Sequence, residues 1–336
     1  MQTRRASRAA AAAVSGTTRA ASVAVAASSP PRKKPNTQNV SRHTTTSGRS
    51  IPFDSEYNIQ EEMRSLVLSR VSGLNDTTIE RNIDTETIGG WCLVDGLVHC
   101  ATASNSILLP LIKEHGPPRF YLDHIKKIAS RSDDDASASG SNNTDDLRSF
   151  RSLCQIVSGQ QLAGNAAKTI WRRLLKVVDA TEEDSTNLTP DRILSIVENG
   201  DTESDLRAPA GLSNAKCNCI IAIAMSFKEG TLSDNILLGG EAADDEVRSR
   251  LLSIKGLGPW SVDMFLLFQC HKSDVLPIGD LAFRNGTSNL WGVKGKAKGG
   301  GLCQRKDEQL MRDLHGPFAP YRSLSSYYMY KCSGMK

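Results

Sequence analysis

The residues best placed to do chemistry lie in one stretch of the sequence, from 251 to 286. This stretch contains a glycine-rich turn at 255–258 (KGLG) and an acidic residue, Asp280, twenty positions after Trp260. A carboxylate held in place can stabilise positive charge in a transition state, and it can orient or deprotonate an attacking water. Asp280 also precedes a short predicted helix, so a purely structural N-cap is the alternative interpretation.

The turn at 255–258 has the properties of a phosphate-binding hairpin. Pro259 ends the preceding helix near Ile254, and a second, apolar helix is predicted over 261–268. Glycines let the backbone approach another backbone closely, because a Cβ would obstruct it. Exposed amides at the start of the second helix would face outward beside its positive dipole end. Lys255 adds a cation at the tip, although a plain turn between two helices is the alternative.

The elements that must position these residues are predicted from apolar periodicity. Helices are predicted over 61–71, 106–113, 121–129, 147–159 (capped by Asp145 or Asp146), 163–178, 214–227 (capped by Ser213) and 246–254. Residues 91–94 fit either a short strand or the start of a helix. Strand-type alternation is almost absent, so the predicted fold class is all-α.

Five ordered motifs in this chain resemble those of the helix-hairpin-helix (HhH-GPD) DNA glycosylase superfamily, specifically the DNA-3-methyladenine glycosylase II branch. They are LSIKGLGPWS at 252–261, LPIGDLAFRNG at 276–286, IVSGQQLA at 156–163, LRAPAGLSNAK at 206–216 and PYRS at 320–323. The resemblance covers about 97–332. It implies a helix-hairpin-helix DNA glycosylase fold, with two helical subdomains around a cleft.

The resemblance implies that Asp280 is the catalytic carboxylate of a glycosylase for alkylated purines in base excision repair. Such an enzyme rotates the damaged nucleotide out of the duplex, and Gln161 and Leu162 are the candidates to fill the gap. Helix capping and core packing are their alternative roles. Cleavage of the N-glycosidic bond leaves positive charge on the sugar. An alkylated purine leaves as a neutral base, so the reaction needs no second catalytic acid.

Trp260 occupies the position where bifunctional members of the superfamily place a lysine nucleophile. A tryptophan forms no Schiff base, and its face can stack on an electron-poor base; core packing is its alternative. We therefore expect a monofunctional enzyme. The DNA contacts expected are Gln161, Leu162, Lys255, Gly256, Gly258 and Ser261. A monovalent cation often lies against hairpin carbonyls in the family, by position those of Leu252, Ile254 and Leu257.

Two other functions of the same fold stay open on the sequence. One is a glycosylase for oxidised or mismatched bases, and the other is a non-catalytic module that uses the hairpin only for phosphate contact. Asp263 is predicted to be a helix-surface or structural residue without a chemical role, and the tyrosines of the last helix are predicted to belong to the core. In that helix Tyr327 and Tyr330 replace tryptophans usual in the branch, which bears on the substrate range.

The cysteines exclude several site types. The eight cysteines form no CxxC pair and no compact group of four, which fits reduced thiols and excludes an iron–sulfur cluster. Two His/Cys neighbours, at 99–100 and 270–271, have no partners at metal-ligand spacing.

No apolar run reaches the roughly 18 residues of a membrane span. The predicted partner is double-stranded DNA with a damaged base, bound by a monomer.

The net charge of +4 is unevenly distributed along the 336 residues. The first 53 residues hold nine Lys or Arg and no acid, while the rest hold 32 basic and 37 acidic residues. A DNA-binding surface must therefore be a local patch. Residues 1–50 are predicted to be a disordered basic tail. The motif PPRKKP at 30–35 favours a nuclear address; a mitochondrial or plastid transit peptide, or a tail without an address, is the alternative.

The predicted organisation therefore has three parts. They are the tail at 1–50, a poorly defined extension at 51–96 and a glycosylase domain at 97–332. Within the domain, 131–146 is predicted to be an acidic, disordered insertion, and 246–268 forms the helix-hairpin-helix. The Lys- and Gly-rich run at 292–301 is an insertion relative to the family, with no role that the motifs assign.

Overall fold

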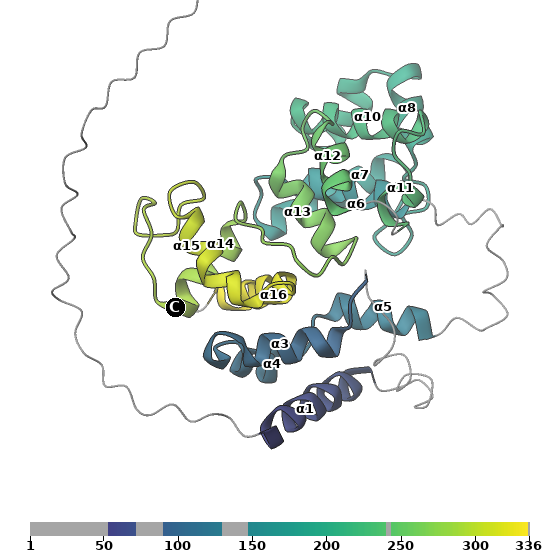
Figure 1. The fold of residues 1–336 in the computed structure, drawn as a ribbon. Helices are drawn as coiled ribbons and strands as arrows, with labels where there is room; N and C mark the ends of the chain where they lie inside the picture. Colours follow the sequence, from purple (N-terminus) through teal and green to yellow (C-terminus); the bar gives the residue numbers. More distant parts are fainter. Residues whose placement is uncertain (1–52, 72–89, 130–146, 240–242, 335–336) are drawn as a thin grey trace, which may run out of the picture. The chain divides into compact units, whose positions relative to one another are not determined.

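A computed structural model of the protein describes residues 53–71, 90–129, 147–239 and 243–334. This part of the chain is built from helices and contains no strand (Figure 1), which confirms the all-α prediction. The predicted tail at 1–50 and the predicted insertion at 131–146 lie outside the described residues. None of the described helices is both long and apolar enough to cross a membrane.

The described helices surround two hydrophobic cores, as expected for two helical subdomains. The first core belongs to a central lobe made of α6 (Arg148–Gly159), α7 (Gly164–Val177), α8 (Pro190–Asn199), η2 (Thr202–Arg207), α9 (Ala208–Ala210), α10 (Asn214–Lys228), α11 (Asp234–Leu238), α12 (Asp244–Leu252) and α13 (Pro259–Phe268). The second belongs to a terminal lobe made of α1 (Phe53–Val71), α3 (Leu93–Ser106), α4 (Leu109–His115), α5 (Arg119–Ala129), α14 (Leu281–Trp291), α15 (Glu308–His315), η3 (Gly316–Phe318) and α16 (Arg322–Cys332). The two ends of the described chain thus share one core, coloured blue and yellow in Figure 1.

The extension before residue 97 contributes to the terminal core. Met63 and Val67 of α1 are fully buried there, together with Leu93 at the start of α3. Residues 91–94 are therefore the entry to a helix, and not a strand. The sequence predicted no helix over most of α3, whose last turn has non-helical backbone angles at Ala103 and Ser104.

Two helix starts show how capping residues are supplied. Ser213 caps α10 as predicted, because its hydroxyl accepts a hydrogen bond from Lys216 N. At α6 the cap comes from a distant residue. The buried Asp234 carboxylate accepts hydrogen bonds from Arg148 N (3.0 Å) and Ser149 N (2.8 Å). The predicted caps, Asp145 and Asp146, lie outside the described residues.

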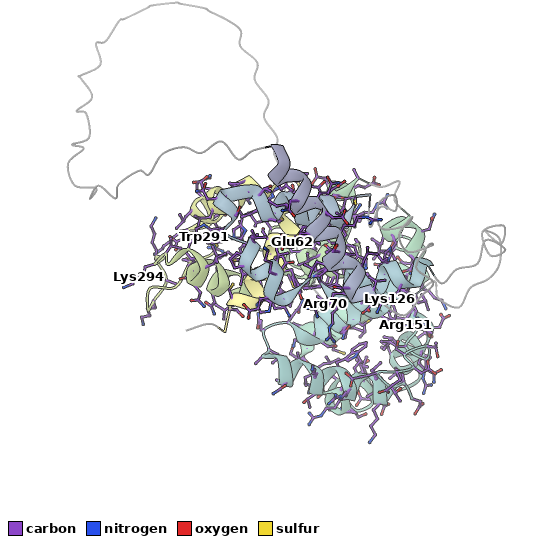
Figure 2. All side chains as sticks on the ribbon, turned by 90° about the horizontal axis from the view of Figure 1, so that it is seen from below. Glu62, Arg70, Lys126, Arg151, Trp291 and Lys294 are labelled. Atoms are coloured by element: carbon purple, nitrogen blue, oxygen red, sulfur yellow. The ribbon has the colours of Figure 1, made fainter. Side chains whose placement is uncertain are left out.

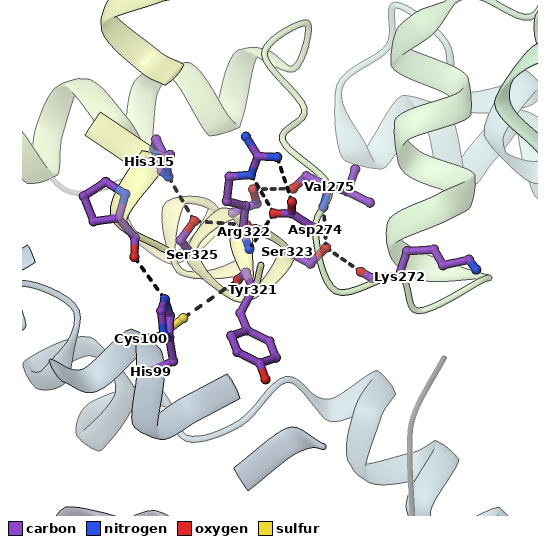
Figure 3. A network of polar contacts seen from close by, with 12 residues as sticks. His99, Cys100, Lys272, Asp274, Val275, His315, Tyr321, Arg322, Ser323 and Ser325 are labelled. Carbon is purple, nitrogen blue, oxygen red and sulfur yellow. Dashed lines mark hydrogen bonds and ion pairs between the residues drawn. The ribbon is translucent and has the colours of Figure 1, made fainter. Parts of the chain in front are cut away.

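The start of α16 holds the connection between α13 and α14 in place (Figure 3). The Arg322 guanidinium donates to both oxygens of Asp274, at 2.6 and 2.7 Å. The Ser323 hydroxyl donates to Lys272 O (2.5 Å) and accepts from Val275 N (3.0 Å). These bonds fix the chain a few residues before Asp280. The PYRS motif thus has a structural role in the connection between the lobes.

Candidate active site

The predicted hairpin is present between α12 and α13. Gly258 is the N-cap of α13, and Pro259 is its first residue. Leu257 N donates to Ile254 O (3.1 Å), which closes the turn. The backbone N–H groups of Gly258, Trp260 and Ser261 donate to no acceptor among the described residues. These free donors at a helix start are the arrangement that binds a phosphate.

The two glycines of the hairpin serve different purposes. Gly256 has a φ of +105°, and a Cβ on it would lie 2.7 Å from the Cβ of Cys219 in α10. Its place is thus set by packing inside the protein. A Cβ on Gly258 would meet no atom within 4 Å. Only Gly258 fits the expectation that a glycine keeps the surface open for an approaching backbone.

Gln160 connects the hairpin to the turn between α6 and α7. Its Nε2 donates to Gly256 O and to the Ser261 hydroxyl, both at 2.9 Å. Sequence reasoning assigned no DNA-site role to Gln160. The Ser261 side chain is buried and held by this bond, so its predicted contact with DNA can involve only its backbone N–H. No signal in the sequence indicates that the two turns meet.

Gln161 and Leu162 lie at the exposed tip of the α6–α7 turn. Gln161 has a left-handed backbone with φ of +57°, which is uncommon for a residue other than glycine. Leu162 is 40% exposed, so it does not pack in the core. An exposed leucine on a turn tied to the hairpin fits the predicted role of a wedge. The structure thus brings Gln161 and Leu162 to the same region as the hairpin.

Asp280 and Trp260 are in direct contact, although twenty residues separate them. The Trp260 indole Nε1 donates to Asp280 Oδ2 at 2.8 Å. Asp280 Oδ1 accepts from Phe283 N (2.9 Å) and caps α14. The capping interpretation of Asp280 is therefore correct, but it uses only one of the two oxygens. Leu281, the next residue, is 62% exposed, so this helix start faces solvent.

Tyr330 of α16 belongs to the same neighbourhood and packs against core residues, as the sequence predicted. Its hydroxyl lies 3.9 Å from the Met264 sulfur, and its ring is 6.0 Å from that of Phe268. Burial and the nearby carboxylates of Asp280 and Asp263 raise the pKa of Tyr330 well above its usual range. It packs against both hydrophobic cores. Tyr330 thus lies where the two lobes meet beside the catalytic candidate.

Asp263 has the structural role predicted for it. It is buried and accepts a hydrogen bond from Arg248 at 2.8 Å. Burial raises the pKa of its carboxyl group, and the Arg248 guanidinium opposes this shift. Asp263 is therefore held by a residue of α12, and it braces the hairpin helices against each other.

Two lysines lie near the predicted DNA-binding turns. Lys255 is exposed at the hairpin tip. Lys216 is held by the end of α6, because its ammonium donates to Ser158 O at 2.9 Å. Partial burial lowers the pKa of Lys216. The position facing Asp280 is thus filled by Trp260, and Lys216 is engaged elsewhere.

A cavity of about 850 Å³ lies apart from these residues, between α1, α5 and α16. It is lined by the cations Arg70, Arg119, Lys126 and Lys331; Figure 2 labels Arg70 and Lys126. None of the predicted site residues lines it. Among the described residues, no group of three His, Cys, Asp or Glu side chains is placed to hold a metal ion.

Comparisons with known proteins agree with this helix-hairpin-helix architecture. The chain matches the HhH-GPD superfamily of base excision DNA repair proteins over residues 154–312. It is 29% identical over 188 residues to DNA-3-methyladenine glycosylase 1 of Schizosaccharomyces pombe, covering 55% of this chain and 72% of that protein. It is 26% identical over 200 residues to the DNA-3-methyladenine glycosylase of Saccharomyces cerevisiae, covering 54% and 66%.

The fold is similar to a solved structure of the Schizosaccharomyces pombe 3-methyladenine DNA glycosylase in complex with abasic DNA. The TM-score is 0.51 at 22% identity, and the match covers 70% of this chain and 95% of that one. The matched region, residues 154–312, belongs to the HhH-GPD superfamily of base excision DNA repair proteins.

Proposed function

We propose that this protein is a monofunctional DNA glycosylase that hydrolyses the N-glycosidic bond of alkylated purines. The observation that carries the proposal is the contact between Trp260 and Asp280 at the solvent-facing start of α14. It places an aromatic ring beside a fixed carboxylate, and it puts no amine at that position. The two DNA-3-methyladenine glycosylases similar to this chain support the choice of alkylated purines.

DNA binding begins at the hairpin in this mechanism. The free N–H groups at the start of α13 take a phosphate, and Lys255 adds positive charge at the tip. The α6–α7 turn, joined to the hairpin by Gln160, presents Gln161 and Leu162 to the duplex. Insertion of these side chains fills the gap that the rotated nucleotide leaves.

Asp280 then acts on the sugar of the rotated nucleotide. Its two hydrogen bonds, from Trp260 and Phe283, hold the carboxylate in one orientation. The negative charge stabilises the oxocarbenium-like transition state. The carboxylate can also orient or deprotonate the water that attacks the sugar. The alkylated purine leaves with the bonding electrons as a neutral base, and the product is an intact abasic strand.

The carbonyl groups of the hairpin fit the monovalent cation that the family resemblance implies. The oxygens of Leu252 and Leu257 accept no hydrogen bond from a described residue, and that of Ile254 accepts one. Backbone carbonyls are the ligands that such cations take in proteins. When bound, the cation would supply positive charge beside a DNA phosphate. The proposed reaction does not depend on it.

The partner in this proposal is duplex DNA with a damaged base, bound by one copy of the chain. The motif PPRKKP at 30–35 favours the nucleus as the place of action. The acid-free, Arg-rich N-terminus is the ground for the alternative, a mitochondrial or plastid transit peptide. A fluorescent fusion of the full chain tests this address. Signal in mitochondria or plastids would favour the transit-peptide alternative.

A release assay on single-lesion duplexes tests the function. We expect free alkylated purine to be released, with no strand break until alkali or heat is applied. Borohydride should trap no protein–DNA adduct, because no amine attacks the sugar. Release of oxidised or mismatched bases alone would favour the related glycosylase. Binding without release of any base would indicate a non-catalytic DNA-binding module.

A further inference from the structure

The lysine-rich loop that follows α14 has no role in the mechanism described so far. We define it as residues 292–306, between α14 and α15. It carries five exposed basic residues: Lys294, Lys296, Lys298, Arg305 and Lys306. Figure 2 shows Lys294 near Trp291, the last residue of α14. The nearest acid in sequence, Asp307, is buried. The loop is thus a local basic patch on a fold that is not basic overall.

The loop has a defined conformation. Asp307 Oδ2 accepts hydrogen bonds from Lys296 N (2.7 Å) and Cys303 N (2.8 Å). These bonds lower the pKa of the Asp307 carboxyl group. Gly295 N donates to Gly300 O at 2.8 Å. A Cβ on Gly295 would lie 2.5 Å from Gly301 O and 2.6 Å from Asp307 Oδ2, so only glycine fits there.

The loop is attached beside the catalytic segment. Leu302 is buried in the terminal core. A Cβ on Gly279, the residue before Asp280, would lie 3.4 Å from Gln304 Nε2 and 3.5 Å from the Trp260 Cβ. Gln304 is therefore a direct neighbour of the segment that carries Asp280. Gln304 thus joins the loop, which belongs to the terminal lobe, to the segment of Asp280, whereas the hairpin belongs to the central lobe.

Most of the loop's cations have no acidic partner in the described part of the chain. Lys296 lies 4.0 Å from Asp307, and the other four form no ion pair there. Some cations elsewhere on the protein are paired with acids. Lys113 lies 2.7 Å from Glu62, and Lys228 is paired with Asp191. Unpaired cations at fixed positions beside a DNA-processing site are suited to bind phosphates.

We propose that the loop at 292–306 is a second anchor for the DNA phosphate backbone, acting from the terminal lobe next to Asp280. The inference rests on the proposed function. The hairpin and the loop would then hold the DNA from both lobes. The contact is electrostatic and carries no sequence information.

The salt dependence of binding to an abasic duplex tests the proposal. The test protein carries Lys294→Gln with Lys298→Gln, and the matched control carries Lys113→Gln with Lys228→Gln. The slope of log affinity against log salt should become shallower by about 0.9 for each phosphate that the variant no longer neutralises, so by up to about 2 in the test protein. The control should keep the wild-type slope. Excision at saturating DNA should stay within about twofold of wild type, because Asp280 and Trp260 are unchanged.

A second pair of variants keeps every charge. Gly295→Ala forces Asp307 and the backbone apart, so it should displace the loop and weaken binding to abasic duplex. Gly301→Ala has open space around its new methyl group and should bind like wild type. Circular dichroism melting shows whether each variant folds. If Gly295→Ala does not fold, the charge variants alone test the proposal.

An unchanged salt slope in the Lys294/Lys298 variant would overturn the proposal. A loop that binds an acidic protein and not DNA would give this result. This result is distinguishable from failure of the proposed function. If the wild-type protein bound abasic duplex but released no base, the function would fail while the slope comparison still decided the role of the loop.

Discussion

Asp280 combines a structural and a chemical role in one side chain. One oxygen caps α14 and the other accepts the indole hydrogen bond of Trp260. A helix cap contributes about 1 kcal/mol to stability and fixes the position of the carboxylate. The sequence alone left capping and catalysis as alternatives, and the geometry makes them compatible.

The indole hydrogen bond of Trp260 should be needed for the rate. Trp260→Phe keeps an aromatic face but removes the donor to Asp280, and a hydrogen bond to a charged group contributes about 1.5–3 kcal/mol. We expect single-turnover excision to fall roughly tenfold or more. Trp91→Phe is the matched control, because Trp91 Nε1 donates to His271 O at 2.8 Å within the structural framework. It should lower thermal stability and leave the excision rate unchanged. Equal rates for wild type and Trp260→Phe would contradict the role of this bond.

Leu162 should act on the duplex and not on folding. Leu162→Ala should leave stability within about 0.5 kcal/mol, because the side chain is exposed. It should slow excision from a duplex, and the defect should shrink for a lesion in single-stranded DNA, which needs no gap filled. Met225→Ala removes another exposed side chain, on α10, and should change neither rate. A defect of equal size on both substrates would argue against the wedge.

At the scale of elements, substitution of one hairpin glycine should affect DNA binding, and substitution of the other should affect folding. Gly258→Val should fold, since nothing lies within 4 Å of its Cβ position, and should weaken binding to all DNA sequences alike. Gly256→Ala should instead lower the melting temperature, because of its φ of +105° and the contact with Cys219. Fluorescence anisotropy with two unrelated duplex sequences and thermal melts measure the two effects. Wild-type affinity in folded Gly258→Val would remove the hairpin as the anchor.

The elements also show how far the sequence could predict this fold. Apolar periodicity identified α6, α7 and α10, because each has a continuous buried face. It missed most of α3, where small and polar residues such as Ser104 give little period and the last turn is irregular. Apolar periodicity could not predict polar contacts between residues far apart in the sequence. The Asp234 cap of α6, the Gln160 bridge and the Arg322–Asp274 pair all join residues that only the tertiary fold brings together.

At the scale of the whole molecule, two buried histidines make stability depend on pH. Burial lowers the pKa of His315 to about 3 and that of His271 to about 4. His315 Nε2 lies 3.0 Å from the Thr287 hydroxyl and its Nδ1 lies 3.0 Å from the Ser325 hydroxyl, so both ring nitrogens face uncharged groups. Burial is the main cause of the lowered pKa of His315, and the positive charge of Arg322 adds to it. In the unfolded chain both histidines bind protons below about pH 6.5.

The free energy of unfolding should therefore be flat with respect to these groups above about pH 6.5 and should fall as the pH drops toward 4. Each histidine contributes a slope of up to about 1.4 kcal/mol per pH unit in this range. Urea unfolding at several pH values measures the slope for wild type and for His315→Gln, which cannot titrate. The slope of the free energy of unfolding against pH should be smaller in His315→Gln by the contribution of one titrating group, up to about 1.4 kcal/mol per pH unit. Identical slopes would show that His315 is protonated in the folded protein.

The central claim, that Asp280 performs the excision chemistry, is tested most directly by the single-turnover release of an alkylated purine by Asp280→Asn. Asparagine keeps the shape and the helix cap, and it removes the charge that stabilises the cationic transition state. We expect release to fall by at least about a hundredfold while binding to abasic duplex is retained. A folded Asp280→Asn protein that kept more than about a tenth of the wild-type rate would contradict the mechanism.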